Sequence, residues 1–549
     1  MYQEIFTYNF LSNFLISTFF LTFNIIFSYS LSGFLKDNKI KILDPFQPII
    51  IFILIFSLYS SLFNVLIISG AYDFFNVILF AIILFQIFFI FKNFRNLKKF
   101  EYLFLKSNYL ERYILFILIL FFLISILPIS DADSISLHQN MANEIYLSGF
   151  NNINLEKNIS YTIFSNTQSL LILSPILKSD NFGSQLNLFM LAFFILLNIK
   201  KNEKFAYIIF ACPLIIYFIS AQKLQLFFGI IYLLIFIIVN KNLIKNKIEL
   251  FITILLLVFY ASGNLSYILF SIPLYLYIFY QYKKYWNHIL IYSLLSFLII
   301  LFPIFLTKQI YFSNIFAPFL DNIFGSKNFL FNAYAYSVKS TDGWISNPLN
   351  FELYLRPFIS FNVSKFSSSL GIIFLLMICS YKTLKKTNYF PLIIIFLVLA
   401  TGQILPRYYF EAFLLLAYYY KSENQITKVI LIAHNFLIVI ISIGFLYFAY
   451  LDKEVLSDKK KYMNKFSYTF YNSQQQKNLK LSENVLDFGS NRPSTFYDKN
   501  YFSMRTLNIL NQFEENNEKY LINFIKKNSI NYLIIGDKTD LPSCIVSKK

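Results

Sequence analysis

A chain of 549 residues in which 57% of residues are hydrophobic and only 14% are charged is not an ordinary soluble globular protein, because too few polar side chains are present to cover its surface. The net charge of +18 does not indicate a nucleic-acid-binding protein either, since the basic residues lie in short stretches between apolar runs and not in one arm or groove. Composition and charge therefore predict a membrane protein whose partners include membrane lipids and no nucleic acid.

Apolar runs of about twenty residues, long enough to cross a hydrocarbon core of roughly 30 Å as a helix, recur through residues 1–450. We therefore expect an α-helical polytopic membrane protein with about 11–14 transmembrane helices in this domain. The first run is expected to remain as a helix, because only Glu4 stands where a signal peptide would carry positive charge. The predicted spans cover residues 10–31, 49–70, 74–92, 112–129, 184–199, 205–220, 224–240, 248–262, 264–280, 288–306, 366–381, 389–405, 408–420 and 428–450.

Basic residues cluster on alternate connections between these runs, which the positive-inside rule assigns to the cytoplasmic side. They are Lys36, Lys39 and Lys41; Lys92, Arg95, Lys98, Lys99 and Lys106; Lys200, Lys201 and Lys204; Lys241, Lys245 and Lys247; Lys283 and Lys284; and Lys382, Lys385 and Lys386. The intervening connections then face outward, and they include long loops at 130–183 and 307–365 and the tail from residue 451. We expect the functional site of this membrane protein to lie on the outward-facing side, since loops of that length usually carry function.

The first external loop opens with ISDADSISLHQNMANEIYLSG, residues 129–149, directly after an apolar run. Ser134 is a good helix N-cap and Gly149 a good terminator, and apolar residues recur between them at helical spacing. Asp131 and Asp133 stand at the N-terminal end, where the helix dipole favours ionised carboxylates. This pattern predicts an amphipathic helix on the membrane surface with two carboxylates at its beginning.

The composition changes after residue 450 to a polar segment without a spanning run. Within it, NEKYLINFIKKNSI (517–530) is typical of an amphipathic helix, and NYLIIG (531–536) of a strand that glycine ends. We therefore expect residues 451–549 to form a small external soluble α/β domain.

Several kinds of catalytic site are missing from the sequence. It has no phosphate-binding glycine loop, zinc-ligand spacing or serine-hydrolase elbow, and Cys212, Cys379 and Cys544 are scattered. Asp131 and Asp133 remain as the catalytic candidates, because a carboxylate on the outer face could accept the proton of a hydroxyl or amine that attacks a sugar carbon. The alternative is that they only cap a surface helix.

Five further residues are candidates for substrate binding. His138 either orients a carboxylate, contacts a phosphate or packs at the interface, whereas Glu144 is expected to be solvated. Arg407 lies between two apolar runs and either snorkels to the interface or binds a lipid phosphate with two parallel hydrogen bonds. The others are Lys223, as a phosphate contact or an interface anchor, Trp344, as a sugar-stacking or aromatic-belt residue, and Arg356 in the second external loop.

Three short motifs carry a family resemblance. DADSISLHQNMANEIYLSG after a span resembles the first external loop of membrane glycosyltransferases of the GT-C fold, especially the family 39-like relatives of protein O-mannosyltransferases and aminoarabinose transferases. LPRYYFEAFLLLAY is similar to their late arginine-tyrosine motif, and FIKKNSINYLIIG to the tail of bacterial members. The chain differs from the family pattern at Ser136 and Leu137, where an aromatic residue commonly precedes the histidine, and at Glu411, where proline is frequent.

The resemblance implies a transferase that moves a sugar from a polyprenyl-phosphate donor to a glycan, lipid or protein acceptor on the external face. It implies no nucleotide and no obligatory metal cofactor, and it leaves a divalent cation open. By analogy, Asp131 is the general base or acceptor-binding acid, Asp133 its partner, and Arg407 and Lys223 contact the donor phosphate. Asp131 and Arg407 should then open into one cavity in the outer leaflet.

Two other functions fit the same composition. An O-antigen-polymerase-like or ligase-like enzyme also joins many spans to large external loops, but it would depend more on external arginines. A polysaccharide flippase or other transporter would carry out no chemistry, and it would favour short loops and internally repeated halves.

Overall fold

The computed structural model describes most of the helical body and small parts of the tail. The described residues are 13–93, 109–127, 129, 131, 133–150, 159–198, 202–317, 354–355, 357–358, 369–403, 405–421, 425–450, 484–487, 501–503, 522–523 and 525–534. Most of the second long loop, with Trp344 and Arg356, lies outside them, as does most of the tail.

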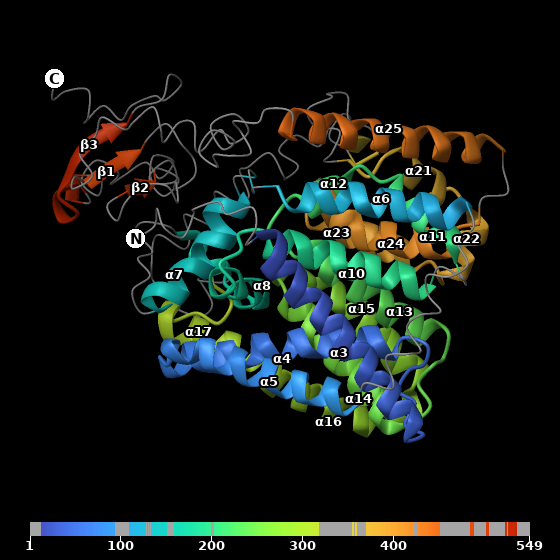
Figure 1. Ribbon diagram of the computed structural model, residues 1–549, viewed down its shortest axis with the longest axis horizontal. Helices are drawn as coiled ribbons and strands as arrows, with labels where there is room; N and C mark the ends of the chain where they lie inside the picture. Colours follow the sequence, from blue (N-terminus) through green and yellow to red (C-terminus); the bar gives the residue numbers. More distant parts are fainter. Residues whose placement is uncertain are drawn as a thin grey trace.

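Every predicted apolar run coincides with one or more helices, which lie roughly along one direction (Figure 1). The helices of the first half are α3 (Thr18–Asp37), α4 (Gln47–Ser69), α5 (Phe75–Lys92), α6 (Tyr109–Ser125), α7 (Asn140–Ser148), α8 (Asn166–Leu171), α9 (Leu173–Ile176), α10 (Phe182–Asn198), α11 (Glu203–Phe210), α12 (Leu214–Ile219) and α13 (Gln225–Asn240). Those of the second half are α14 (Lys247–Ser262), α15 (Leu265–Gln281), α16 (Trp286–Ser296), α17 (Phe302–Phe312), α21 (Ile372–Ile378), α22 (Tyr381–Lys386), α23 (Phe390–Ala400), α24 (Phe410–Tyr419) and α25 (Gln425–Tyr450).

Fewer of these helices are long enough to cross a bilayer than the sequence predicted. Among the described residues, five stretches have the length and apolar composition of a span: Leu15–Asp37, Gln47–Ser69, Tyr72–Lys92, Lys283–Phe312 and Gln425–Tyr450. The predicted run at 205–220 is instead divided into α11 and α12 near Pro213, and α21 has only 7 residues. Proline lacks the amide hydrogen that a continuous helix needs, so the helix breaks there although the sequence stays apolar. The apolar run is therefore longer than either of the two helices.

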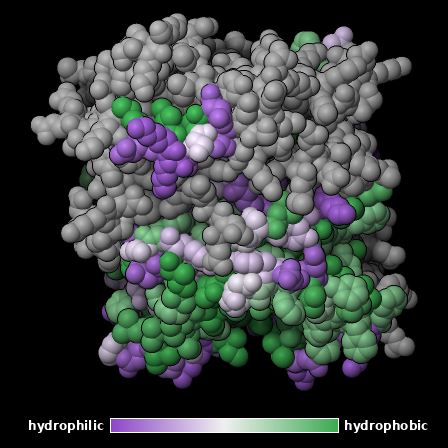
Figure 2. Space-filling model, turned by 90° about the vertical axis from the view of Figure 1, so that its left-hand side faces the viewer, coloured by the Kyte–Doolittle hydropathy of each residue, from purple (hydrophilic) through white to green (hydrophobic). Residues whose placement is uncertain are grey.

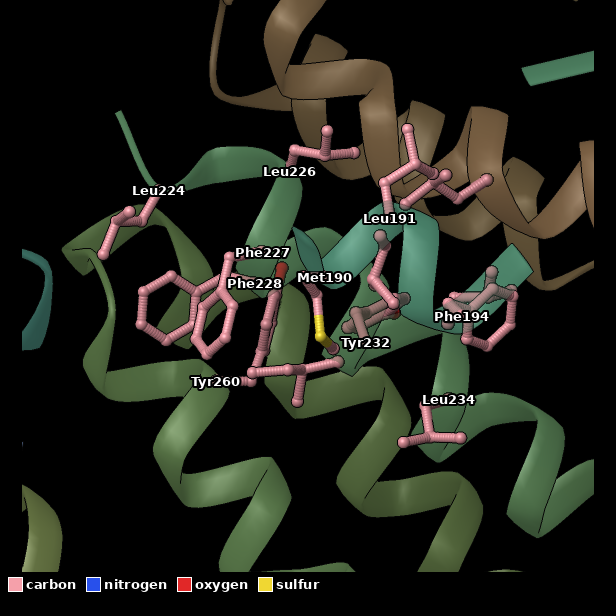
Figure 3. Close-up of a cluster of buried hydrophobic side chains, with 14 of the residues drawn as sticks. Met190, Leu191, Phe194, Leu224, Leu226, Phe227, Phe228, Tyr232, Leu234 and Tyr260 are labelled. Carbon is pink, nitrogen blue, oxygen red and sulfur yellow. The ribbon is translucent and has the colours of Figure 1, made fainter. Parts of the chain in front are cut away.

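The centre of the bundle is α13, in which every residue from Gln225 to Val239 is buried. It packs against α10, α14 and α24. Figure 3 shows this core, with Phe228 and Tyr232 of α13 beside Tyr260 of α14; the Tyr232 and Tyr260 rings lie 4.9 Å apart. Because lipid tails are as apolar as these side chains, close packing of this kind is what favours association of helices in a membrane.

The helix connections divide between the two ends of the bundle. The C-terminal end of α6, the N-terminal ends of α10 and α13, and α7 lie at one end, which we call the Asp131 end (left in Figure 1). The lysine-bearing turns after α13 and α15 lie at the other, which we call the lysine end. The length of α13, about 24 Å at 1.5 Å per residue, separates Lys223 from Lys241. Figure 2 looks onto the Asp131 end, where a pale and purple hydrophilic band lies above a green hydrophobic region.

The helix predicted on the membrane surface is instead buried in the protein. A π-helical turn, η4 (Ser134–Gln139), leads into α7, whose Met141, Ala142 and Ile145 are fully buried against neighbouring helices. Gly149 ends α7 as predicted, with φ of 76°, and a Cβ there would clash with the Tyr72 ring. The helix is amphipathic as predicted, but its apolar face packs on α8 and α9 instead of on lipid.

The described part of the tail contains a three-stranded parallel sheet in the order β2-β1-β3, formed by β1 (Asn484–Asp487), β2 (Tyr501–Ser503) and β3 (Ile530–Ile534). The strand β3 coincides with the predicted strand, and it lies toward the Asp131 end of the molecule (Figure 1).

Candidate active site

Asp131 sits between the end of α6 and the beginning of η4, and it caps the helical segment that follows. Its Oδ2 accepts hydrogen bonds from the Ser134 amide at 2.9 Å and from the Ser134 hydroxyl at 2.7 Å. The sequence predicted Ser134 as the cap; the structure gives that role to Asp131, since a carboxylate satisfies the unpaired amide more strongly than a hydroxyl does. No hydrogen-bond partner of Asp131 Oδ1 occurs among the described residues, and the side chain is 23% exposed.

Lys223 brings the two acids together from the turn between α12 and α13. Its Nζ lies 2.9 Å from Asp133 Oδ2 and 3.3 Å from Asp131 Oδ2, and it donates to the Tyr217 hydroxyl. The ammonium therefore donates hydrogen bonds to Asp133 and Tyr217 and forms an ion pair with Asp131. Two hydrogen bonds fix the turn itself. The side-chain amide of Asn187 donates to the Lys223 carbonyl at 2.6 Å, and the backbone amide of Gln222 donates to the Ser134 hydroxyl at 2.9 Å.

The paired charges explain how ionised groups persist where side chains are largely buried. Burial alone would raise the pKa of Asp131, but the Lys223 ammonium and the two Ser134 hydrogen bonds outweigh burial and leave the pKa below its ordinary value. Burial likewise opposes the charge on Lys223, yet Asp131 and Asp133 raise its pKa above the ordinary value. Asp131 is therefore a carboxylate and Lys223 an ammonium at neutral pH.

Arg407 borders the same cluster from the short helical turn before α24. Its Nη1 lies 3.8 Å from Asp133 Oδ2, and its guanidinium carbon lies over the Tyr408 ring, 5.3 Å from the ring centroid. Gln225 of α13 donates to the Arg407 carbonyl at 2.8 Å and so fixes the backbone. With its side chain 28% exposed, Arg407 keeps surface for a ligand while its contacts form a continuous chain through Asp133 and Lys223 to Asp131.

His138 is neutral, and it lies close enough to the cluster for its pKa to be affected by Lys223, Asp133, Asp131 and Arg407. Its Nδ1 lies 3.0 Å from the Gln168 amide nitrogen, and Gln168 Oε1 accepts from the Ser165 hydroxyl at 2.6 Å. The amide group therefore donates to Nδ1, which implies that the ring carries its proton on Nε2. Burial, reinforced by Lys223, lowers the pKa of His138 to about 4.

The structure thus brings together five of the predicted site residues: Asp131, Asp133, His138, Lys223 and Arg407. Trp344 and Arg356 lie outside the described residues. Glu144, predicted to be solvated, is partly exposed and accepts a hydrogen bond from the Asn140 side chain at 3.3 Å.

Sequence reasoning missed two contributors to this region. Tyr217 contacts Lys223, but in the sequence it is one aromatic residue in an apolar run. Glu411 appeared only as a departure from a motif, yet it is fully buried one helical turn after Arg407 and accepts a hydrogen bond from the Tyr260 hydroxyl at 3.0 Å. An acid inside an apolar helix is the signal that could have identified it.

Within the part of the chain that the structure describes, no three His, Cys, Asp or Glu side chains are grouped as metal ligands. The cluster is instead a set of two carboxylates, one ammonium and one guanidinium at the Asp131 end of the bundle. No family model, curated protein or solved structure matches the chain. The site must therefore be interpreted from its own chemistry.

Proposed function

We propose that the protein is a membrane glycosyltransferase that moves a sugar from a polyprenyl-phosphate donor to an acceptor on the external face of the membrane. The observation that carries this proposal is the continuous chain of contacts from Asp131 through Lys223 and Asp133 to Arg407. These contacts place a carboxylate and a guanidinium at the same end of a bundle of apolar helices. The carboxylate suits a polar acceptor, and the guanidinium suits a lipid-linked anion.

Asp131 is proposed to act on the acceptor. Its Oδ2 is occupied by Ser134 and Lys223, which leaves Oδ1 to take the proton of an acceptor hydroxyl as that oxygen forms its bond to the sugar carbon. The low pKa of Asp131 keeps it ionised, and the fixed Oδ2 keeps it oriented. The bond that breaks joins the sugar carbon to the donor phosphate, so the polyprenyl phosphate leaves with the electron pair.

Arg407 is proposed to hold that phosphate. The leaving phosphate gains negative charge in the transition state, and a guanidinium is suited to it because it offers two parallel donors and never loses its proton. The sequence resemblance implies the same role for Lys223, but its contacts favour another. Since its ammonium is already paired with Asp131 and Asp133 and donates to Tyr217, we propose that it positions the carboxylates and keeps them ionised.

The finer features of the proposal are those that the sequence resemblance implies. They are a GT-C-like arrangement of the helical domain, an external α/β domain formed by the tail, and a periplasm-facing site in the inner membrane. The parallel sheet at the Asp131 end and the lysine-bearing turns at the opposite end support this orientation.

Transfer can be tested in proteoliposomes supplied with radiolabelled polyprenyl-phosphate hexoses and pentoses and an extract of cell-envelope acceptors. Asp131→Asn keeps the shape of the side chain but removes the basic oxygen, so transfer should fall by roughly 10²- to 10⁴-fold. Glu144→Gln is the matched control, because it removes a carboxylate from α7 outside the cluster. Labelled donor that crosses the membrane without labelling any acceptor would establish a transporter and reject the transferase.

A further inference from the structure

A hydrophobic groove lies between α15 and α23, away from the candidate active site. Its volume is about 730 Å³, and its walls include Leu269, Ile272, Leu276, Ile393 and Leu397. From Leu269 to Gln281 the groove follows α15 for about 18 Å at 1.5 Å per residue. One leaflet of a bilayer has a hydrocarbon thickness of about 15 Å, so the groove is about as long as a leaflet is deep.

One mouth of the groove is polar, and it lies at the lysine end of the bundle. Asn388 lines this mouth and donates to the Tyr277 hydroxyl at 2.9 Å and to the Asn240 side-chain oxygen at 3.0 Å. Gln281 and Tyr280 line the same end. Side chains that are apolar along the groove and amphipathic at its mouth match the division between lipid tails and headgroups.

The turn that carries Asn388 has an unusual backbone. Asn388 and Tyr389 both have positive φ, at 50° and 57°. For a bulky residue such as tyrosine this conformation is rare and costs energy. Such residues persist where the surrounding structure fixes the backbone, and they cluster at functional sites. Here the two residues place α22 and its lysines directly before the groove wall formed by α23.

Four exposed lysines adjoin this mouth. Lys283 and Lys284 follow Gln281 at the end of α15, and Lys385 and Lys386 precede Asn388 at the end of α22. No acidic residue occurs in the sequence from Asn264 to Leu320 or from Leu353 to Phe410, so both segments present positive charge without local compensation. Clusters of lysines beside pockets between membrane helices are typical of sites for anionic lipid headgroups.

From the groove, its polar mouth and the adjoining lysines together, we infer that this site binds an anionic phospholipid of the cytoplasmic leaflet, with its acyl chains along α15 and α23 and its phosphate beside Lys283, Lys284, Lys385 and Lys386. Charge complementarity selects this occupant over a neutral phospholipid. The site is at the end of the bundle opposite to Asp131, and it does not depend on the proposed transferase activity.

The test is native mass spectrometry of the delipidated full-length protein, titrated with phosphatidylglycerol or with phosphatidylcholine of the same acyl chains. We expect saturable binding of phosphatidylglycerol at least tenfold tighter than that of phosphatidylcholine, because each lysine near a phosphate strengthens binding roughly fivefold before screening. The variant Lys283→Gln/Lys284→Gln/Lys385→Gln/Lys386→Gln should lose this preference. All four side chains are exposed, so the fold should not depend on them.

Two further variants separate this site from general attraction between lysines and lipids. Lys39→Gln/Lys41→Gln/Lys245→Gln/Lys247→Gln removes the same charge from exposed positions that do not adjoin a groove-lining residue in the sequence, and it should retain the preference. Ile393→Trp should weaken binding with all lysines intact, because it fills the groove from a position that is 44% exposed. Equal loss in both lysine variants, unchanged binding in the Trp variant, or equal affinity for both lipids would each overturn the inference.

Discussion

Replacing Lys223 by methionine isolates the part that charge plays in the candidate site. Methionine preserves most of the length of the side chain but removes the ammonium, so Asp131 and Asp133 lose the cation that lies 3.3 and 2.9 Å from them. At these distances and an effective dielectric constant of about 20, each attraction amounts to about 5 to 6 kcal/mol before desolvation is subtracted. Removal of one partner from a buried ion pair typically costs about 3–5 kcal/mol, and we expect a value at the lower end because each carboxylate is about one-fifth exposed.

This destabilisation should depend on pH in a definite direction. In the wild-type protein the pKa of Asp131 is lowered, so its contribution to stability is present above the ordinary pKa of aspartate and is lost as pH falls. Without Lys223, burial and the neighbouring Asp133 both raise the pKa of Asp131, and protonation then relieves the repulsion. The variant should therefore be most destabilised near neutral pH and approach the wild type in acid.

Thermal unfolding in nanodiscs at pH 7 and pH 5 measures this difference, and the double variant Lys223→Met/Asp133→Asn provides the matched control. Because Asp133→Asn removes the nearer carboxylate, the double variant should unfold at a higher temperature than Lys223→Met alone, as expected for residues that interact directly. Equal unfolding temperatures of the wild type and Lys223→Met at both pH values would refute the reasoning, since the lysine would then hold neither carboxylate.

Three further predictions test other parts of the site. Arg407→Ala should weaken binding of a polyprenyl-phosphate sugar severely and Arg407→Lys moderately, because lysine keeps the charge but loses the two parallel N–H groups. Binding of this sugar can be measured in nanodiscs. Wild-type affinity in Arg407→Ala would show that the arginine is an interface anchor only. Because the pKa of His138 is about 4, its ring should stay neutral and add no step to the pH profile of transfer between pH 5 and 8, and a step that disappears in His138→Gln would contradict this. Cysteines introduced at Ser148 and Ser503 should both react with an impermeant reagent from outside intact cells, and labelling of one alone would reject the predicted topology.

The location of helices along the chain follows from sequence alone for a local reason. A backbone in lipid must satisfy its own hydrogen bonds, so a long apolar run there forms a helix whatever lies next to it. The runs that contain α4 and α25 were placed within a few residues for this reason. The number of spans does not follow from composition alone, because breaks such as the one near Pro213 change helix length without changing composition.

The same local reasoning identified the candidate residues but not their relations. Charged side chains are costly within apolar sequence, so Asp131, Asp133, Lys223 and Arg407 stood out. Only the tertiary structure shows Lys223 against Asp133, 90 residues away in the chain. That contact depends on how α12 and α13 pack against the segment after α6, and no local pattern encodes such packing. The burial of α7 has the same origin: periodicity defines an apolar face, but whether protein or lipid covers that face depends on helices far away in the sequence.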